Sequence, residues 1–138
     1  MVCIYCGSET EISNSRNQKK TNSKWRRRTC PHCQATLTTI ETFDLSKAVS
    51  VRSNKSYQPF SRDKLFISLF YSCKHLKKPE LVAGGLTDTI ISKLMPRISD
   101  ATIDISEIIE VSADTLKHFN KAAHVYYLAY HPLQTKNS

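Results

Sequence analysis

Residues 24–33 read KWRRRTCPHC, a run of three arginines followed almost at once by the cysteine pair Cys30 and Cys33. A second pair with the same spacing, Cys3 and Cys6, stands near the start of the chain. A C-x-x-C turn holds two thiolates one tetrahedral edge apart, so two such turns complete a four-cysteine shell around zinc. The spacing therefore predicts one Zn2+ ion per chain, held by Cys3, Cys6, Cys30 and Cys33.

Other interpretations of the cysteines and their neighbours are weaker. Four thiolates also hold iron in rubredoxin-like electron carriers, but such sites need a compact, largely uncharged surround, and here the connecting segment is basic. A dithiol redox role would need only a single C-x-x-C pair. His32 could replace one thiolate, yet four thiols are available, so we expect it at the surface. Gly7 suits a turn that needs a positive φ. Cys73 lies in a helical apolar stripe, which predicts a buried free thiol.

The composition limits the class of protein. Of the 138 residues 40% are hydrophobic, and no apolar run reaches about 18 residues, so no membrane span is predicted. The start of the sequence, MVCIYCGSE, is polar after six residues and already contains two cysteines, so we expect no secretory signal. We therefore expect a cytoplasmic protein whose thiols stay reduced, which favours metal binding over disulfides. No nucleophile–base pair or phosphate-cradling glycine loop stands out, so we do not expect an enzyme.

Basic residues are concentrated around the second cysteine pair. The formal net charge is +8, and residues 12–40 contain seven Lys and Arg residues but no acid. Arginines held by a metal site lose less entropy on meeting phosphates or guanine edges than a floppy tail would. We therefore favour a nucleic-acid interface over a solvated charge run. The candidate residues are Arg16, Lys24, Arg26, Arg27 and Arg28. Trp25 and Tyr5 could stack on bases, although packing over the ribbon is the favoured role.

The chain divides into two halves of different character. Residues 1–46 are too few to bury a core unaided, so zinc binding would supply most of their folding free energy. Residues 13–24 are polar and predict a loop, whereas β-branched residues alternate at 36–43 and predict a strand. A second strand is expected at 48–52, followed by a turn within 53–59. Residues 47–138 are numerous enough to bury a core of their own.

Helices are predicted from residue 61 onward. An apolar stripe with Ser61 as its N-cap predicts a helix over 61–78. A second should run from Pro79 to about Met95, although the glycines at 84 and 85 weaken its middle. A third should begin after Ser106, and a fourth should cover 122–130. The predicted class is α+β, with a small β ribbon before a mostly helical domain.

Several motifs together resemble a known family. The segments CIYCG (3–7), NSR (14–16), RRRTCPHC (26–33) and LTTIE (37–41) are similar, in order and spacing, to the zinc ribbon of NrdR, the bacterial repressor of ribonucleotide reductase genes. The segments VRSN (51–54) and QPFSRDKL (58–65) resemble the start of an ATP-cone, the nucleotide-binding domain of that family. The resemblance covers nearly the whole chain.

This resemblance implies both a fold and a function. A four-cysteine zinc ribbon at 1–46 would bind double-stranded operator DNA, and an ATP-cone at 47–138 would place four helices under a β-hairpin lid. The cone would sense ATP against dATP and change the state of a homo-oligomer. By position, Arg52 and Lys64 would face the nucleotide phosphates. The implied nucleotide site comprises Val51, Arg52, Lys55, Gln58 and Lys64.

Some positions depart from the family pattern. Trp25 replaces the first of four arginines, Gln58 replaces an acid, and Lys55 stands where a glycine is common. Lys64 also fits an ordinary surface lysine in the first turn of a helix. Two alternatives therefore stay open: a zinc-ribbon adaptor for nucleic acid or protein whose cone no longer holds nucleotide, or a metal-thiolate redox protein.

Overall fold

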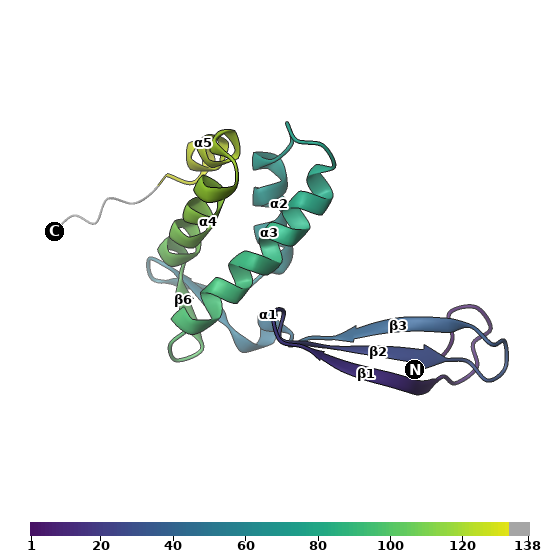
Figure 1. Cartoon of the computed structure of the whole chain (residues 1–138). Helices are drawn as coiled ribbons and strands as arrows, with labels where there is room; N and C mark the ends of the chain where they lie inside the picture. The colour runs from purple at the N-terminus through teal and green to yellow at the C-terminus, as the bar shows by residue number, and fades with distance from the viewer. Residues whose placement is uncertain (133–138) are drawn as a thin grey trace. The chain divides into compact units, whose positions relative to one another are not determined.

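The computed structural model describes residues 1–132, which fall into two compact units. The first unit comprises residues 1–43, and the second begins at Asp44. Figure 1 shows a β ribbon in the first unit and helices with a few short strands in the second. The α+β class, with a β ribbon before a helical region, is therefore as predicted.

The first unit is a three-stranded antiparallel sheet. Its strands β1 (Glu11–Gln18), β2 (Ser23–Thr29) and β3 (Thr36–Glu41) pair in the order β1-β2-β3, so β2 is central. The strand predicted at 36–43 is confirmed as β3, although it ends at Glu41. The loop predicted at 13–24 is wrong, because most of that segment forms β1 and the start of β2. Strand β1 is exposed along its whole length, so its sequence does not alternate between apolar and polar residues. That alternation is the pattern by which a strand is predicted, and β1 therefore could not be recognised from its sequence.

The ribbon has no apolar core. Of residues 1–43, only Cys3 and Cys30 are buried, with 2% and 1% of their surface exposed. Large apolar side chains such as Ile4, Tyr5 and Phe43 lie at the surface. The fold of this unit must therefore come from strand pairing and from whatever the cysteines hold.

The second unit packs helices against a small mixed sheet. Its helices are α1 (Leu45–Ala48), α2 (Arg62–Ser72), α3 (Pro79–Leu94), α4 (Ile105–Phe119) and α5 (Lys121–Tyr130), and a 3-10 turn η1 (Met95–Arg97) follows α3. The strands β4 (Ser50–Ser53) and β5 (Ser56–Pro59) form an antiparallel hairpin, and β6 (Thr102–Asp104) runs parallel to β4. The strand predicted at 48–52 is displaced to 50–53, because α1 takes up residues 45–48.

Local capping signals explain where the helices begin. The Ser61 hydroxyl accepts a hydrogen bond from the Lys64 backbone N–H at 3.2 Å and caps α2, as predicted. Pro79 occupies the first turn of α3, which continues through both glycines to Leu94. The helix predicted to begin after Ser106 begins earlier, at Ile105, because Asp104 and Glu107 form a capping box.

One cluster of apolar side chains joins the helices of the second unit. Leu69 of α2, Ile90 of α3 and Leu116 of α4 are 0% exposed, and Tyr127 of α5 is 2% exposed. Cys73 is also fully buried in this cluster, which confirms the predicted buried thiol and raises its pKa by desolvation. Within residues 1–132, none of the helices has the length and apolar character needed to cross a bilayer. Burial of this surface gives the second unit folding free energy of its own.

Candidate metal centre and nucleic-acid interface

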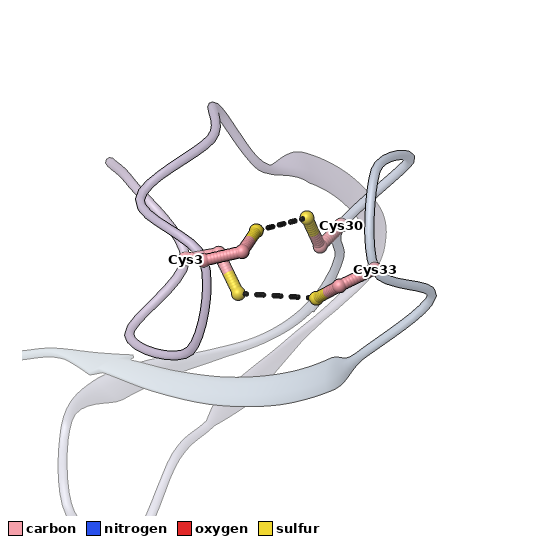
Figure 2. A group of neighbouring side chains, drawn as sticks. Cys3, Cys30 and Cys33 are labelled. Carbon is pink, nitrogen blue, oxygen red and sulfur yellow. Dashed lines mark hydrogen bonds between the residues drawn. The ribbon is translucent and has the colours of Figure 1, made fainter.

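The four predicted zinc ligands meet beside one end of the ribbon. Cys3 and Cys6 precede β1, and Cys30 and Cys33 lie in the loop between β2 and β3. Their Sγ atoms all lie within 4.8 Å of one another, with 3.6 Å between Cys3 and Cys33 and 3.5 Å between Cys6 and Cys30. Figure 2 shows Cys3 on one loop turned toward Cys30 and Cys33 on the other.

The arrangement of the sulfurs fits a tetrahedral zinc ion. Zn–S bonds of about 2.3 Å give a tetrahedron with edges of about 3.8 Å, close to both measured Sγ separations. All four thiols are free rather than joined in disulfides. A shell of four thiolates would be closed, so the site suits a structural metal and not one that binds substrate.

Both cysteine loops are turns of the same construction. The Gly7 N–H donates to the Cys3 carbonyl at 2.9 Å, and the Gln34 N–H donates to the Cys30 carbonyl at 2.9 Å. Gly7 has a φ of +75° and Gln34 a φ of 63°. The positive φ predicted for Gly7 is confirmed, and Gln34 holds the same conformation without the freedom of glycine. The two turns thereby aim their thiols at one point.

The pKa values of Cys6 and Cys33 shift in opposite directions when no cation is bound. Hydrogen bonds from the Ser8 backbone and hydroxyl lower the pKa of Cys6 to about 6. The Ala35 backbone also lowers the pKa of Cys33, but desolvation and hydrogen bonds with the other three cysteines outweigh it and raise that pKa to about 12. Four thiolates this close repel one another, so a bound dication is what would let all of them ionise.

The five predicted DNA-binding residues lie on two neighbouring strands of the ribbon. They are Lys24, Arg26, Arg27 and Arg28 on β2 and Arg16 on β1. Arg26 donates to the Ser15 hydroxyl on β1 at 3.3 Å and pairs with the Glu41 carboxylate on β3 at 3.2 Å. The sequence did not indicate these two partners, because each contact depends on the strand register.

The two aromatic residues near the cysteines have different surroundings. Trp25 is half-buried, and the Arg27 guanidinium carbon lies 5.6 Å from the centre of its ring. Packing over the ribbon, the role favoured from the sequence, thus describes Trp25, whereas Tyr5 is exposed. His32 is exposed as predicted.

Known proteins resemble this chain in sequence, over the ribbon and beyond it. Residues 1–41 match the family described as "Transcriptional repressor NrdR-like, N-terminal domain", a zinc ribbon. Over 126 residues the chain is 32% identical to the transcriptional repressor NrdR of Acidiphilium cryptum, which covers 91% of this chain and 83% of the relative. The chain belongs to the NrdR family. The NrdR repressor of Rhodospirillum centenum is 30% identical over 131 residues, covering 92% of this chain and 82% of the relative. That of Finegoldia magna is 29% identical over 126 residues, covering 91% and 83%.

In this NrdR-family chain, the residues implied as a nucleotide site lie on the β4–β5 hairpin and in the first turn of α2. Val51 pairs with Gln58 across the hairpin, and the Lys64 ammonium donates to the Gln58 side-chain oxygen at 3.2 Å. Lys55 lies in the turn between the two strands. Because directly paired residues share a face of the hairpin, Val51 and Gln58 lie together on one side.

Arg52 lies on the opposite face of the same hairpin. Its Nε and Nη2 donate to the two carboxylate oxygens of Asp104 at 2.5 Å and 2.8 Å, and Tyr57 is its cross-strand partner. These hydrogen bonds lower the pKa of Asp104 and raise that of Arg52. The spacing of Asp104 and Glu107 could have indicated a helix cap, but nothing local indicated the contact with Arg52. The structure thus separates Arg52 from the Gln58–Lys64 contact.

Proposed function

We propose that this chain is a zinc-dependent, nucleotide-responsive repressor that binds double-stranded DNA upstream of ribonucleotide reductase genes. The observation that carries the proposal is a four-cysteine cluster beside an exposed sheet whose central strand holds Lys24, Arg26, Arg27 and Arg28. The relatives are named transcriptional repressors, which supports a regulatory role and not a catalytic one.

The DNA-binding part of the proposal rests on rigidity and charge. The cysteines would hold zinc in a closed shell, which fixes the two loops beside the sheet. The strands then present their cations as an ordered array to phosphates and base edges. One small ribbon offers few contacts, so we infer that two or more ribbons of a homo-oligomer bind one duplex.

The second unit is proposed to bind ATP or dATP at the β4–β5 hairpin. Support comes from Lys55 in the hairpin turn and Lys64 in the first turn of α2, because a triphosphate requires fixed cations, whereas Arg52 lies on the other face of the hairpin. Arg52 and Lys64 now donate to Asp104 and Gln58, so phosphate oxygens would have to replace these two acceptors. A nucleotide that favours one assembly over another would then change how paired ribbons meet DNA.

The purified full-length chain tests both parts of the proposal. We expect one zinc per chain, binding of added ATP or dATP, and a band shift with a reductase promoter fragment that weakens steeply with salt. Lys64→Ala should weaken nucleotide binding and keep the zinc. Lys77→Ala, at an exposed lysine beyond the C-terminal end of α2, is the matched control. Absence of a salt-sensitive band shift would remove the DNA-binding claim.

A zinc-ribbon adaptor that holds no nucleotide is the second candidate function. It is favoured by the position of Arg52, which faces away from the Gln58–Lys64 contact and is already bound to Asp104. In this case calorimetry with ATP and dATP gives no binding heat, while zinc and nucleic-acid binding persist. Iron in place of zinc in the metal analysis would instead support an electron carrier.

A further inference from the structure

The central strand of the ribbon displays its cations on two opposite faces. Side chains alternate along a strand, and residues paired directly across strands share a face. Arg26 pairs with Ser15 and Thr39, and Trp25 pairs with Arg16 and Ile40. We call one side the Arg26 face, which includes Ile12, Ser15, Asn17, Lys24, Arg26, Arg28, Leu37, Thr39 and Glu41. The opposite side is the Trp25 face, which includes Asn14, Arg16, Trp25, Arg27, Thr38 and Ile40.

Arginines of the Arg26 face bind their own sheet. Arg26 reaches a hydroxyl on β1 and a carboxylate on β3, and its side chain is only 25% exposed. The Arg28 Nε donates to the Thr39 hydroxyl at 3.3 Å. The central strand is thus connected to both neighbours through side chains, in a unit that has no apolar core. Arg26 uses an N–H group on each of its two Nη atoms and Arg28 uses its Nε–H, so each has fewer of its five donors left for a nucleic acid than Arg27 has.

On the Trp25 face, the Arg27 side chain is held by the Trp25 ring. Its guanidinium N–H groups donate no hydrogen bond to the three strands of the sheet, all of which the structure describes. Arg27 is exposed, and its guanidinium lies over the Trp25 ring at 5.6 Å. A cation–π contact restricts the guanidinium but satisfies none of its N–H groups, which remain able to bind phosphate or the O6 and N7 atoms of guanine. Arg16, on β1 directly opposite Trp25, adds a second exposed cation.

We propose that the Trp25 face is the surface that meets the DNA duplex, with Arg16 and Arg27 contacting it and Trp25 positioning Arg27. Arg26 and Arg28 stabilise the ribbon instead. The indole restricts the Arg27 side chain before binding, so less conformational entropy is lost when the guanidinium contacts DNA. This inference rests on the proposed DNA-binding function and assigns it to one face of the sheet.

The tryptophan itself provides a direct test, because Trp25 is the only tryptophan in the chain. The probe is a short mixed-sequence DNA duplex added to the zinc-loaded full-length protein, with acrylamide quenching of the indole emission as the readout. We expect the duplex to shield Trp25 from acrylamide, and high salt to reverse the shielding. The comparison protein combines Trp25→Phe with Leu37→Trp, which moves the probe to the Arg26 face opposite Arg28. A tryptophan at position 37 should be shielded less.

Variants separate positioning by Trp25 from a general structural role. Arg27→Ala should weaken duplex binding about tenfold and reduce the salt slope by about 1 per bound chain. Trp25→Ala should weaken binding about threefold, Trp25→Phe should restore most of the loss, and Trp25→Ala should add little in the Arg27→Ala background. Arg26→Ala should alter the salt slope less than Arg27→Ala does and should chiefly lower zinc affinity. Zinc content is measured for every variant.

The outcomes distinguish failure of the inference from failure of the proposed function. If the wild-type protein does not bind any duplex, including the reductase promoter fragment, the DNA-binding function itself is wrong. If it binds but shields position 37 as well as or better than Trp25, the face is wrongly assigned. If Trp25→Ala weakens duplex binding as much in the Arg27→Ala background as in the wild type, Trp25 does not act by positioning Arg27.

Discussion

Residues 1–43 bury two side chains, both of them cysteines, while the helical unit buries apolar side chains from α2, α3, α4 and α5 in one cluster. The ribbon therefore relies on thiols and strand pairing where the helical unit relies on the hydrophobic effect. A sheet without a core can leave both of its faces exposed. Because neither face is covered by a core, charged side chains can lie on both faces of β2. A metal in place of a core thus suits a small surface-rich module.

Loss of a metal ligand should distinguish the two units most strongly. Cys30→Ser should abolish zinc binding and unfold the ribbon, because metal binding contributes on the order of 10 kcal/mol to the folding of such sites. NMR spectra should show loss of chemical-shift dispersion for the ribbon residues and unchanged signals for the helical unit. Metal analysis should show loss of zinc. Cys73→Ser is the matched control, since Cys73 is equally buried but lies in the helical cluster. It should keep the zinc and destabilise only the helices.

A cavity in the helical cluster should produce the reverse pattern. Leu69 is 0% exposed, and Leu69→Ala should lower the free energy of unfolding of the helical unit by about 2–5 kcal/mol. Zinc content should not change. Leu81→Ala, at a leucine on α3 that is 67% exposed, should change stability by less than about 0.5 kcal/mol. Urea titrations followed by far-UV circular dichroism measure both variants, and loss of zinc in Leu69→Ala would show that the units are not independent.

The capping residue Asp104 should have a smaller effect that depends on pH. Its pKa is lowered by Arg52, so its charge stabilises the fold above the unfolded-state pKa, and this contribution is lost as the pH falls below about 4. Asp104→Asn, which can still cap α4, should flatten that part of the stability profile. Asp104→Ala should lower the melting temperature further at neutral pH. Thermal melts between neutral and acid pH provide the measurement, and identical profiles for wild type and Asp104→Asn would contradict the assignment.

The smallest expected effects compare the two cysteine turns. Gln34→Gly should stabilise the metal-bound ribbon by up to about 1 kcal/mol, because Gln34 has a φ of 63° that glycine adopts without strain. Gly7→Ala should cost a similar amount, because alanine is strained at the φ of +75° that Gly7 adopts. Nothing lies within 4 Å of the added methyl group, so no steric clash adds to this cost. Chelator competition for zinc measures both. Equal zinc affinities for the two variants would show that the turns do not limit metal binding.

Local signals made much of the second unit predictable. Ser61 and Pro79 mark helix starts by their own chemistry, and the structure places α2 and α3 accordingly. Strand β1 escaped prediction because it is polar and exposed, so only pairing with β2 defines it. The contacts of Arg26 with Glu41 and of Arg52 with Asp104 were equally inaccessible, because each joins residues far apart in the chain through strand register.

Cysteine spacing was the strongest predictor of the candidate site. The C-x-x-C pairs anticipated a cluster that the structure brings within 4.8 Å, because each pair is fixed by its own tight turn. The faces of the ribbon could not be assigned in the same way. Because residues 13–24 were expected to form a loop, no strand register for β1 and β2 followed from the sequence. Without that register, the sequence does not show which neighbouring side chains Arg26 and Arg27 contact.

Reversible removal of the metal tests the central claim most directly. The full-length protein is stripped with a chelator, tested for binding to a DNA duplex, and tested again after zinc is added back. We expect duplex binding to disappear and return at one zinc per chain, while the helical circular dichroism signal stays constant. Metal-free protein that binds the duplex as tightly as the zinc-loaded form would contradict the account.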